Sequence, residues 1–279
     1  MLHFPSTALP QHIAFLTRLA EVTQTDGRFD GVALSGSYCE NCLDEFSDLD
    51  VILAISEPHL DQVMSQREEL AASFGDLTTQ FTGEHVGEPR LLICLYQTQN
   101  EAPLHVDLKF VASKDINQRV DNPTVLWEKE QSLSSVFATA DGHYPLPSLQ
   151  WFEDRFWVWI HYATTKIARG ELFEAVEFIS FLRQTVIGPL AMQAHGLEPK
   201  GVRKLEALLP EEARKLATTV AQYDKTSLYT ALELLVGFYM TLTIEHMHSP
   251  DFCMNARAKK LALRYLEQQM AQANSFKNG

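Results

Sequence analysis

The sequence predicts an α+β protein in which a small mixed-sheet domain is followed by an all-α helical bundle domain. In the first half, apolar runs of strand length are separated by turn residues and by two helical segments. In the second half, apolar residues recur at helical spacing over long stretches. The length of 279 residues suits two domains of ordinary size. We therefore expect domains over residues 1–145 and 146–279.

The first half is expected to contain at least four strands and two helices. The strand-like apolar runs lie at residues 32–34, 51–55, 91–96 and 106–111, and the helix-like segments lie near 11–22 and 58–73.

The second half is expected to form six helices, over residues 151–169, 171–187, 202–209, 211–222, 227–247 and 256–270. Gly188-Pro189, Gly196 and Pro250 predict breaks between helices. The turn-rich stretch ADGHYPLPS, residues 140–148, predicts the join between the two halves. Ser148 is placed to cap the first long helix.

Negative charge is concentrated in the first half. Residues 1–112 contain 5 Lys and Arg against 17 Asp and Glu, so their net charge is −12 of the −13 carried by the whole chain. A negatively charged surface repels nucleic acid and attracts cations. Metal ions or an amine-bearing substrate are therefore expected as partners, and DNA or RNA is not.

The chain is expected to be cytoplasmic and to lack a membrane span. Its start, MLHFPSTALPQ, has neither the basic flank nor the continuous apolar core of a secretory signal. The most apolar uncharged stretch, residues 234–244, is shorter than the roughly 18 residues that a span needs. Cys39 and Cys42 form a Cys-x-x-Cys pair without a second pair at zinc spacing, so we expect reduced thiols rather than a zinc or redox site.

A Gly-Ser step and two alternating carboxylates lie on one short connection, GSYCENCLDEFSDLD. The strand at 32–34 ends at Gly36 and Ser37, where the missing side chain of Gly36 lets a phosphate approach the backbone, and a helix starting near Tyr38 would face that phosphate. Asp48 and Asp50 point to one face of the next strand. Two carboxylates that close repel unless a cation lies between them, and Mg²⁺ suits one or two carboxylates plus substrate phosphates. The sequence therefore predicts a metal-phosphate site.

A third carboxylate, Asp107, is expected to join this pair. In LHVDLKFV, residues 104–111, His105, Asp107 and Lys109 alternate with apolar residues. If this strand lies beside the one that carries Asp50, Asp107 can act as a metal ligand or as the base that takes a proton from an attacking hydroxyl. The alternative is a half-buried strand with a wet polar face.

These motifs resemble those of the polymerase β-type nucleotidyltransferase superfamily. The order of an α/β domain and then a helical bundle resembles the nucleotidyltransferases that modify lincosamide and aminoglycoside antibiotics. The resemblance implies Mg²⁺-dependent transfer of a nucleoside monophosphate, AMP from ATP above all, to a hydroxyl of a small acceptor with release of pyrophosphate. It also implies that Asp48 and Asp50 hold the metal, that Asp107 assists the acceptor or the metal, and that Gly36 and Ser37 hold phosphate.

The sequence departs from the family pattern at Glu40, since several relatives have a basic residue three positions after the motif serine. A stripe on the first bundle helix, Arg155, Tyr162, Lys166 and Arg169, is spaced by 7, 4 and 3 residues and so lies on one face. Arg155, Lys166 and Arg169 are therefore candidates for binding the triphosphate and stabilising the departing pyrophosphate. Simple solvent exposure of this face is the alternative.

Several other readings of the sequence are weaker. Arg155 and His161 have the Arg-x5-His spacing of certain helical ribonucleases, but positions six apart on a helix diverge by about 120°. The aromatic residues between 151 and 159 are expected to be core, and no histidine is assigned to a metal because no pair is four residues apart. Two other functions remain open: antitoxin-like transfer of AMP to a protein side chain, and a non-catalytic nucleotide-binding module. The oligomeric state is not readable, and a homodimer is compatible with the sequence.

Overall fold

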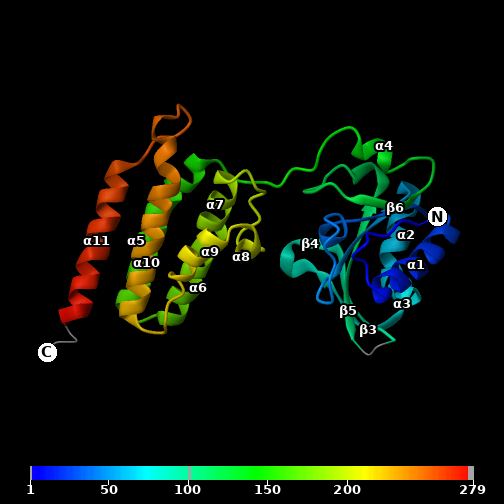
Figure 1. Ribbon diagram of the computed structural model, residues 1–279, viewed down its shortest axis with the longest axis horizontal. Coiled ribbons are helices and arrows are strands. Elements are labelled where there is room, and N and C mark those ends of the chain that lie inside the picture. The colour runs from blue at the N-terminus through cyan, green and yellow to red at the C-terminus, as the bar shows by residue number, and fades with distance from the viewer. Residues whose placement is uncertain (1, 100–101, 276–279) are drawn as a thin grey trace. The chain divides into compact units, whose positions relative to one another are not determined.

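The computed structural model describes residues 2–99 and 102–275 (Figure 1). The chain divides into two compact units, Met1–His143 and Tyr144–Gly279. The first contains a six-stranded mixed sheet with helices, and the second consists of helices, so the predicted α+β class is confirmed. The observed division falls two residues before the expected one.

The sheet of the first unit has the strand order β3-β4-β5-β2-β1-β6. Strands β2 and β5 are parallel, and every other neighbouring pair is antiparallel. The bounds are β1 (Phe29–Leu34), β2 (Leu49–Ile55), β3 (Asp76–Gly83), β4 (Glu88–Gln97), β5 (Pro103–Ala112) and β6 (Thr124–Glu128).

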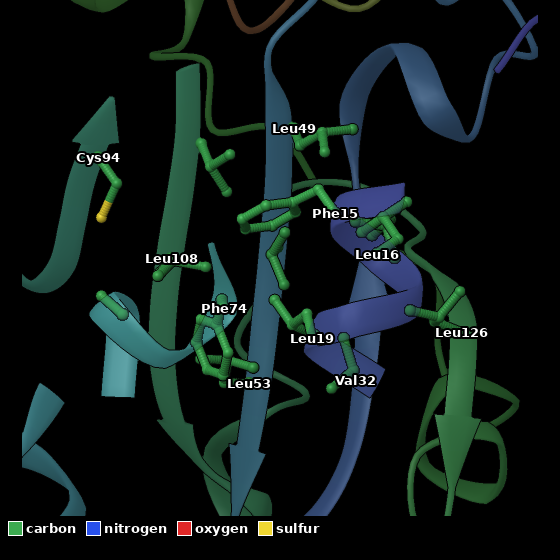
Figure 2. Close-up of a cluster of buried hydrophobic side chains, with 14 of the residues drawn as sticks. Phe15, Leu16, Leu19, Val32, Leu49, Leu53, Phe74, Cys94, Leu108 and Leu126 are labelled. Carbon is green, nitrogen blue, oxygen red and sulfur yellow. The ribbon is translucent and has the colours of Figure 1, made fainter. Parts of the chain in front are cut away.

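One face of this sheet packs against helices α1 (Pro10–Thr25) and α3 (Arg67–Phe74). Figure 2 shows Phe15, Leu16 and Leu19 of α1 and Phe74 of α3 among leucines and valines of the strands. Alternate residues of β2 and β5 point into this core, because strand side chains alternate between faces. The short helices α2 (Leu60–Ser65) and α4 (Ser134–Phe137) complete the unit.

A small apolar cluster packs against one end of the opposite face of the sheet. Ala33, Ala54 and Val111 meet Ile116 and Leu133 there, with Val136 and Phe137 at the margin. The remainder of that face carries the polar residues of β2 and β5. It is therefore the face on which the predicted site lies.

The outer strands β3 and β6 were not expected from the sequence. Strand β3 is the sheet edge beyond β4, and most of its residues, DLTTQFTG, are exposed or half-buried. An edge strand with a wet face lacks the continuous apolar run that marks a buried strand. The helix expected near 58–73 is divided into α2 and α3 at Gln66.

The second unit contains α5 (Leu149–Arg169), α6 (Leu172–Leu182), α7 (Gly188–Ala194), α8 (Leu205–Leu208), α9 (Pro210–Ala217), α10 (Lys225–Thr243) and α11 (Ala256–Ser275). Ser148 caps α5 as expected, since its Oγ accepts a hydrogen bond from the Trp151 N–H at 3.2 Å. A buried carboxylate joins three parts of this unit. Glu153 accepts hydrogen bonds from Trp157 Nε1, the Tyr239 hydroxyl and the Asn255 N–H, at 2.8, 2.7 and 2.9 Å.

The break predicted at Gly188-Pro189 is wrong. The helix continues through a widened π turn, Arg183–Ile187, into α7. Pro189 lies in the first turn after this π segment, and its ring nitrogen has no N–H to donate to the preceding turn. Gly188 also packs directly against the backbone of Gly201, where a Cβ would not fit. The helices expected over 202–209 and 211–222 are shorter than predicted, as α8 and α9.

Within the described residues, one helical stretch, Lys225–His246, is long and apolar enough to cross a membrane by length and composition alone. From the sequence, no stretch was expected to be long and apolar enough to span a membrane. Helix α10, which forms most of it, contacts α5, α6, α7 and α11. Its buried residues belong to the core of the second unit, which accounts for its apolar composition without a membrane.

Candidate active site

The site begins at a tight turn between β1 and β2. Ser35 N donates to Asp50 O at 2.9 Å, and Gly36 follows with φ +62° in the left-handed region. A Cβ at position 36 would collide with Oδ2 of Asp50. The helix expected near Tyr38 is a single 3₁₀ turn, Gly36–Tyr38. Glycine is thus required here both by the backbone and by the carboxylate that lies against it.

Asp48 and Asp50 flank the first residue of β2. Leu49 between them is 1% exposed and belongs to the main core, whereas both aspartates are half-buried. The alternation expected from the sequence therefore holds at this point. It directs the two carboxylates away from the core that Leu49 enters.

Asp107 lies directly opposite Asp50 in the parallel pairing of β5 with β2. Strand β5 has the predicted alternation, with Val106 and Leu108 buried and His105, Asp107 and Lys109 on the other face. Neighbouring strands lie about 4.8 Å apart. The register therefore brings the third carboxylate beside the first two.

The environment of Asp107 disfavours its charge. Burial raises the pKa of this carboxyl above its usual value, and the charge of Asp48 raises it further, while His105 and His85 oppose the shift. His105 Nε2 lies 3.1 Å from Asp107 Oδ1. Apart from this contact, Oδ1 is a buried oxygen with no hydrogen-bond partner in the described part of the chain. Such an atom is suited to receive a proton or a cation.

An ion cluster that the sequence did not reveal adjoins Asp107. Glu88 accepts from Arg90 Nε at 2.8 Å and from Arg90 Nη2 at 2.7 Å, and Lys109 Nζ lies 3.2 Å from the same carboxylate. The hydrogen bonds from Arg90, and then Lys109, lower the pKa of Glu88 to about 2. Lys109 was visible two residues after Asp107, but the strand containing Glu88 and Arg90 was expected to begin only at residue 91.

Asp121 was also missed. Its Oδ1 accepts a hydrogen bond from the Ser35 hydroxyl at 3.3 Å, so a fourth carboxylate borders the turn. It comes from the stretch between β5 and β6, which has no regular pattern in the sequence.

The carboxylates fit a magnesium ion in chemistry, although they do not form a ready-made cage. Across residues 2–99 and 102–275, no three His, Cys, Asp or Glu side chains are gathered tightly enough to hold a metal by themselves. Mg²⁺ usually takes one or two carboxylates and completes its shell with water and substrate phosphate. Three observations are consistent with such an ion. The charge of Asp48 raises the pKa of Asp107, Oδ1 of Asp107 has no hydrogen-bond partner among the described residues, and all the donor atoms are oxygens.

The cationic stripe of α5 is engaged within its own unit. Lys166 Nζ lies 2.6 Å from Glu171 and 3.0 Å from Glu174, both near the start of α6, and Arg169 lies 3.6 Å from Glu171. The Tyr162 hydroxyl donates to Glu174. Arg155 stacks on the Trp151 ring at 4.1 Å. The stripe is therefore neither a simple solvated face nor a set of unpaired cations.

The weaker candidates are not brought together. His161 stacks on Tyr265 at 4.9 Å, whereas Arg155 lies on Trp151, so the pair does not converge. Cys39 Sγ donates to Leu34 O at 2.9 Å, and the four cysteines are free thiols.

The mixed sheet carries a Gly-Ser turn beside two alternating aspartates, and a third aspartate lies on the adjacent parallel strand. Together with the family match, this arrangement places the chain in the nucleotidyltransferase superfamily. The family model described as streptomycin adenylyltransferase matches residues 12–269. The chain belongs to this family and is an adenylyltransferase enzyme.

The solved structures to which this chain is similar are distant from it. An aminoglycoside 6-adenyltransferase from Bacillus subtilis is 14% identical, with a TM-score of 0.39 over 92% of this chain and 96% of that one. A nucleotidyltransferase-like protein from Exiguobacterium sibiricum 255-15 is 13% identical, with a TM-score of 0.35 over 95% and 89%. The Thermotoga maritima CCA-adding enzyme, complexed with tRNA, is 12% identical, with a TM-score of 0.31 over 94% and 71%. No curated protein matches the sequence.

Proposed function

We propose that the first unit is the catalytic domain, and that it transfers AMP from ATP to a hydroxyl of a small acceptor in a magnesium-dependent reaction that releases pyrophosphate. The observation that carries this proposal is the register of Asp107 opposite Asp50, beside the turn at Gly36. Membership of the streptomycin adenylyltransferase family supports the reaction class. It also makes an antibiotic, an aminoglycoside or a lincosamide, the first acceptor to test.

Each site residue has a role in this proposal. Asp48 and Asp50 would hold Mg²⁺, and the backbone at Gly36 and Ser37 would receive phosphate. The metal supplies positive charge that screens the triphosphate and stabilises the charge developing on it. Asp107 takes the proton of the acceptor hydroxyl as that oxygen forms a bond to the α-phosphorus.

The bond from the α-phosphorus to its bridging oxygen breaks in the same transfer, and pyrophosphate leaves with the bonding electrons. The raised pKa of Asp107 favours the proton transfer from the acceptor hydroxyl, because a carboxylate that is costly to keep charged is a stronger base. The AMP moiety remains on the acceptor oxygen.

Arg155, Lys166 and Arg169 remain proposed contacts to the triphosphate. Lys166 is the most constrained of them, since binding phosphate would require it to share or exchange its two glutamate partners. Because the substrate is ATP, we expect the enzyme to act in the cytoplasm.

The test is to incubate the purified full-length chain with Mg²⁺, each nucleoside triphosphate in turn, and a panel of antibiotics, and then to weigh the products. A mass increase of one AMP on an acceptor, with stoichiometric pyrophosphate, is the expected result. The same incubation with Asp50→Asn is the control. If the chain binds nucleotide but transfers AMP neither to any of the antibiotics nor to an added protein, the result would instead support a non-catalytic module.

A further inference from the structure

Loop 38–47 joins the Gly-Ser turn to the two aspartates that are proposed to hold Mg²⁺. It runs from the residue after Ser37 to the residue before Asp48 and has the sequence YCENCLDEFS. Because it contains no Lys, Arg or His, it cannot attract a triphosphate by charge. Any contribution that this loop makes to phosphate binding must therefore come from the position of its backbone.

The first contact that fixes this backbone is made by the residue directly after Ser37. The Tyr38 side chain is buried, and its hydroxyl donates a hydrogen bond to the His3 carbonyl oxygen at 2.7 Å. Burial raises the pKa of Tyr38 to about 12, so the hydroxyl keeps the proton that it donates. His3 belongs to a stretch that precedes helix α1, which we call segment 3–7. The loop is thus tied to this segment immediately after the Gly-Ser turn.

A second contact forms in the middle of the loop. Asn41 has φ +51°, in the left-handed region that asparagine tolerates better than most residues. Its Oδ1 accepts hydrogen bonds from the Ser6 hydroxyl at 3.2 Å and from the Thr7 N–H at 3.4 Å, and its Nδ2 donates to Ser6 Oγ at 3.1 Å. The Asn41 amide therefore binds two consecutive residues of segment 3–7.

A third contact leads directly back to the Gly-Ser turn. The Leu43 N–H donates to Thr7 Oγ1 at 3.1 Å, and the preceding N–H, of Cys42, donates to the Ser37 carbonyl oxygen at 3.1 Å. Leu43 is buried in the main core of the first unit, where an N–H without a partner would cost free energy. Two consecutive amides of the loop thus link Thr7 to Ser37.

Segment 3–7 is a suitable anchor because it is itself fixed to the first unit. Three apolar residues within or beside it pack against the main core: Leu2, Phe4 and Ala8. Backbone N–H groups stabilise a phosphate most effectively when they are held in place before it arrives. The three contacts meet this condition for the Gly-Ser turn.

We propose that segment 3–7 positions the Gly-Ser turn for Mg²⁺-ATP, and that Thr7 and Asn41 are the positioning residues. This inference rests on the proposed function, in which the turn receives phosphate. Neither residue contacts the nucleotide. Each acts through the loop, by keeping Ser37 at a fixed distance from Asp48. Their loss should therefore weaken nucleotide binding and leave acceptor binding unchanged.

The test compares nucleotide binding by full-length variants that differ in one hydrogen-bonding group. Thr7→Val keeps the shape of the side chain but removes the hydroxyl. We expect it to raise the Kd for a Mg²⁺-bound, non-hydrolysable ATP analogue roughly three- to tenfold, because one partly buried hydrogen bond is lost. Thr7→Ser keeps the hydroxyl and should restore the wild-type Kd. Asn41→Gly keeps the left-handed backbone but loses the amide, and should weaken binding to a similar extent. Titration calorimetry measures each Kd, and the KM for streptomycin should not change.

Two matched controls make the same chemical changes elsewhere in the first unit. Thr25→Val removes a hydroxyl that donates to the Glu21 carbonyl oxygen at 3.0 Å, at the end of α1. Glu130→Gly replaces another left-handed residue, with φ +49°. Neither should alter the Kd. Hydrogen exchange of residues 36–47, measured without metal or nucleotide, should be faster in Thr7→Val than in Thr25→Val.

These measurements separate the inference from the proposed function, because neither exchange nor binding requires AMP transfer. A wild-type protein that binds the analogue but transfers no AMP would reject the proposed reaction, and a weaker Thr7→Val affinity would still support the positioning role. A Thr7→Val Kd within about twofold of wild type would overturn the inference, even with a lowered Tm, since the contact would then serve folding alone. Unchanged exchange of residues 36–47 in Thr7→Val would overturn it as well.

Discussion

Asp50 and Asp107 lie opposite one another on the only parallel strand pair in the described sheet. Because strand side chains alternate, a slip of one residue in this register would turn Asp107 into the core and bring Val106 or Leu108 to the site. The same alternation buries Leu49 next to Asp50. The apolar core of the first unit thus fixes the relative positions of the two carboxylates, which repel each other and would not associate unaided.

Asp48→Asn and Asp50→Asn are each expected to abolish pyrophosphate release while leaving the fold intact. An amide keeps the shape of the side chain but removes the charge that would hold Mg²⁺, and loss of metal positioning should cost several kcal/mol of barrier. Pyrophosphate release measures the effect, and Asp61→Asn, an exposed carboxylate on α2, is the control. Turnover above about a tenth of wild type in both variants would reject a metal-dependent reaction at this site.

Gly36→Ala should impair both the turn and the adjacent carboxylate. The φ of +62° costs a residue with a Cβ about 1 to 2 kcal/mol, and that Cβ would displace Asp50 Oδ2. We expect at least a tenfold loss of transfer and weaker binding of Mg²⁺-ATP, measured by calorimetry. Gly87→Ala, also at positive φ but with no atom near its would-be Cβ, is the control for backbone strain alone. Equal effects of the two substitutions on activity would contradict the role given to Gly36.

The arrangement of the three carboxylates on the strands was predictable from the sequence because its signals are local. The spacing of Asp48, Leu49 and Asp50 and the alternation through Asp107 determine faces of strands, and the apolar partners determine which face is buried. The excess of negative charge in residues 1–112 can likewise be counted directly from the sequence. The pairing of β2 with β5 was an assumption that the structure bears out.

The parts that were missed depend on partners distant in sequence or on edge positions. Glu88 was missed because its ion-pair partner Lys109 lies on the neighbouring strand. Asp121 was missed because its hydrogen-bond partner Ser35 is distant in the sequence. Strand β3 lies at an edge, where no apolar run is required. In the second unit, the stripe on α5 was correctly placed on one helix, but its partners Glu171 and Glu174 belong to the next helix and its first turn.

Lys166 and Arg169 should differ in their effect on stability. The Lys166 side chain is 16% exposed and lies between two glutamates, whereas Arg169 is 65% exposed with one longer contact. Hydrogen bonds to Glu171, then Glu174, raise the pKa of Lys166 above 10.5, so this contribution is fully present below pH 10.5 and is lost as the pH rises through the folded-state value. Thermal unfolding at pH 7 should therefore show a lower Tm for Lys166→Ala than for Arg169→Ala.

The nucleotide role of the same two residues has a separate readout. If they hold the triphosphate, the double alanine variant should bind a non-hydrolysable ATP analogue roughly tenfold more weakly. Unchanged affinity, with a lowered Tm, would assign both side chains to the contact between α5 and α6 alone.

Asp107→Asn should stabilise the metal-free protein at neutral pH. Burial and the charge of Asp48 raise the folded-state pKa of Asp107 above 3.8, so ionisation costs folding free energy that appears as the pH rises from 3.8 through the folded-state value. An asparagine avoids this cost. We expect a Tm a few degrees above wild type at pH 7, since about 2 to 4 °C corresponds to 1 kcal/mol in a protein of this size. The difference should shrink below pH 3.8, and a lower Tm at pH 7 would contradict the argument.

The same variant distinguishes a base from a metal ligand. If Asp107 takes the proton of the acceptor hydroxyl, Asp107→Asn should lower the single-turnover rate by about 10²-fold or more and leave Mg²⁺-ATP affinity nearly intact. If it holds the metal, affinity should fall, and added Mg²⁺ should partly restore the rate. We favour the base, because Asp48 and Asp50 already supply the one or two carboxylates that Mg²⁺ usually takes. Single-turnover rates and nucleotide affinities across a range of Mg²⁺ concentrations decide between the two. Recovery of most of the rate at high Mg²⁺ would leave the acceptor hydroxyl to be activated by another group.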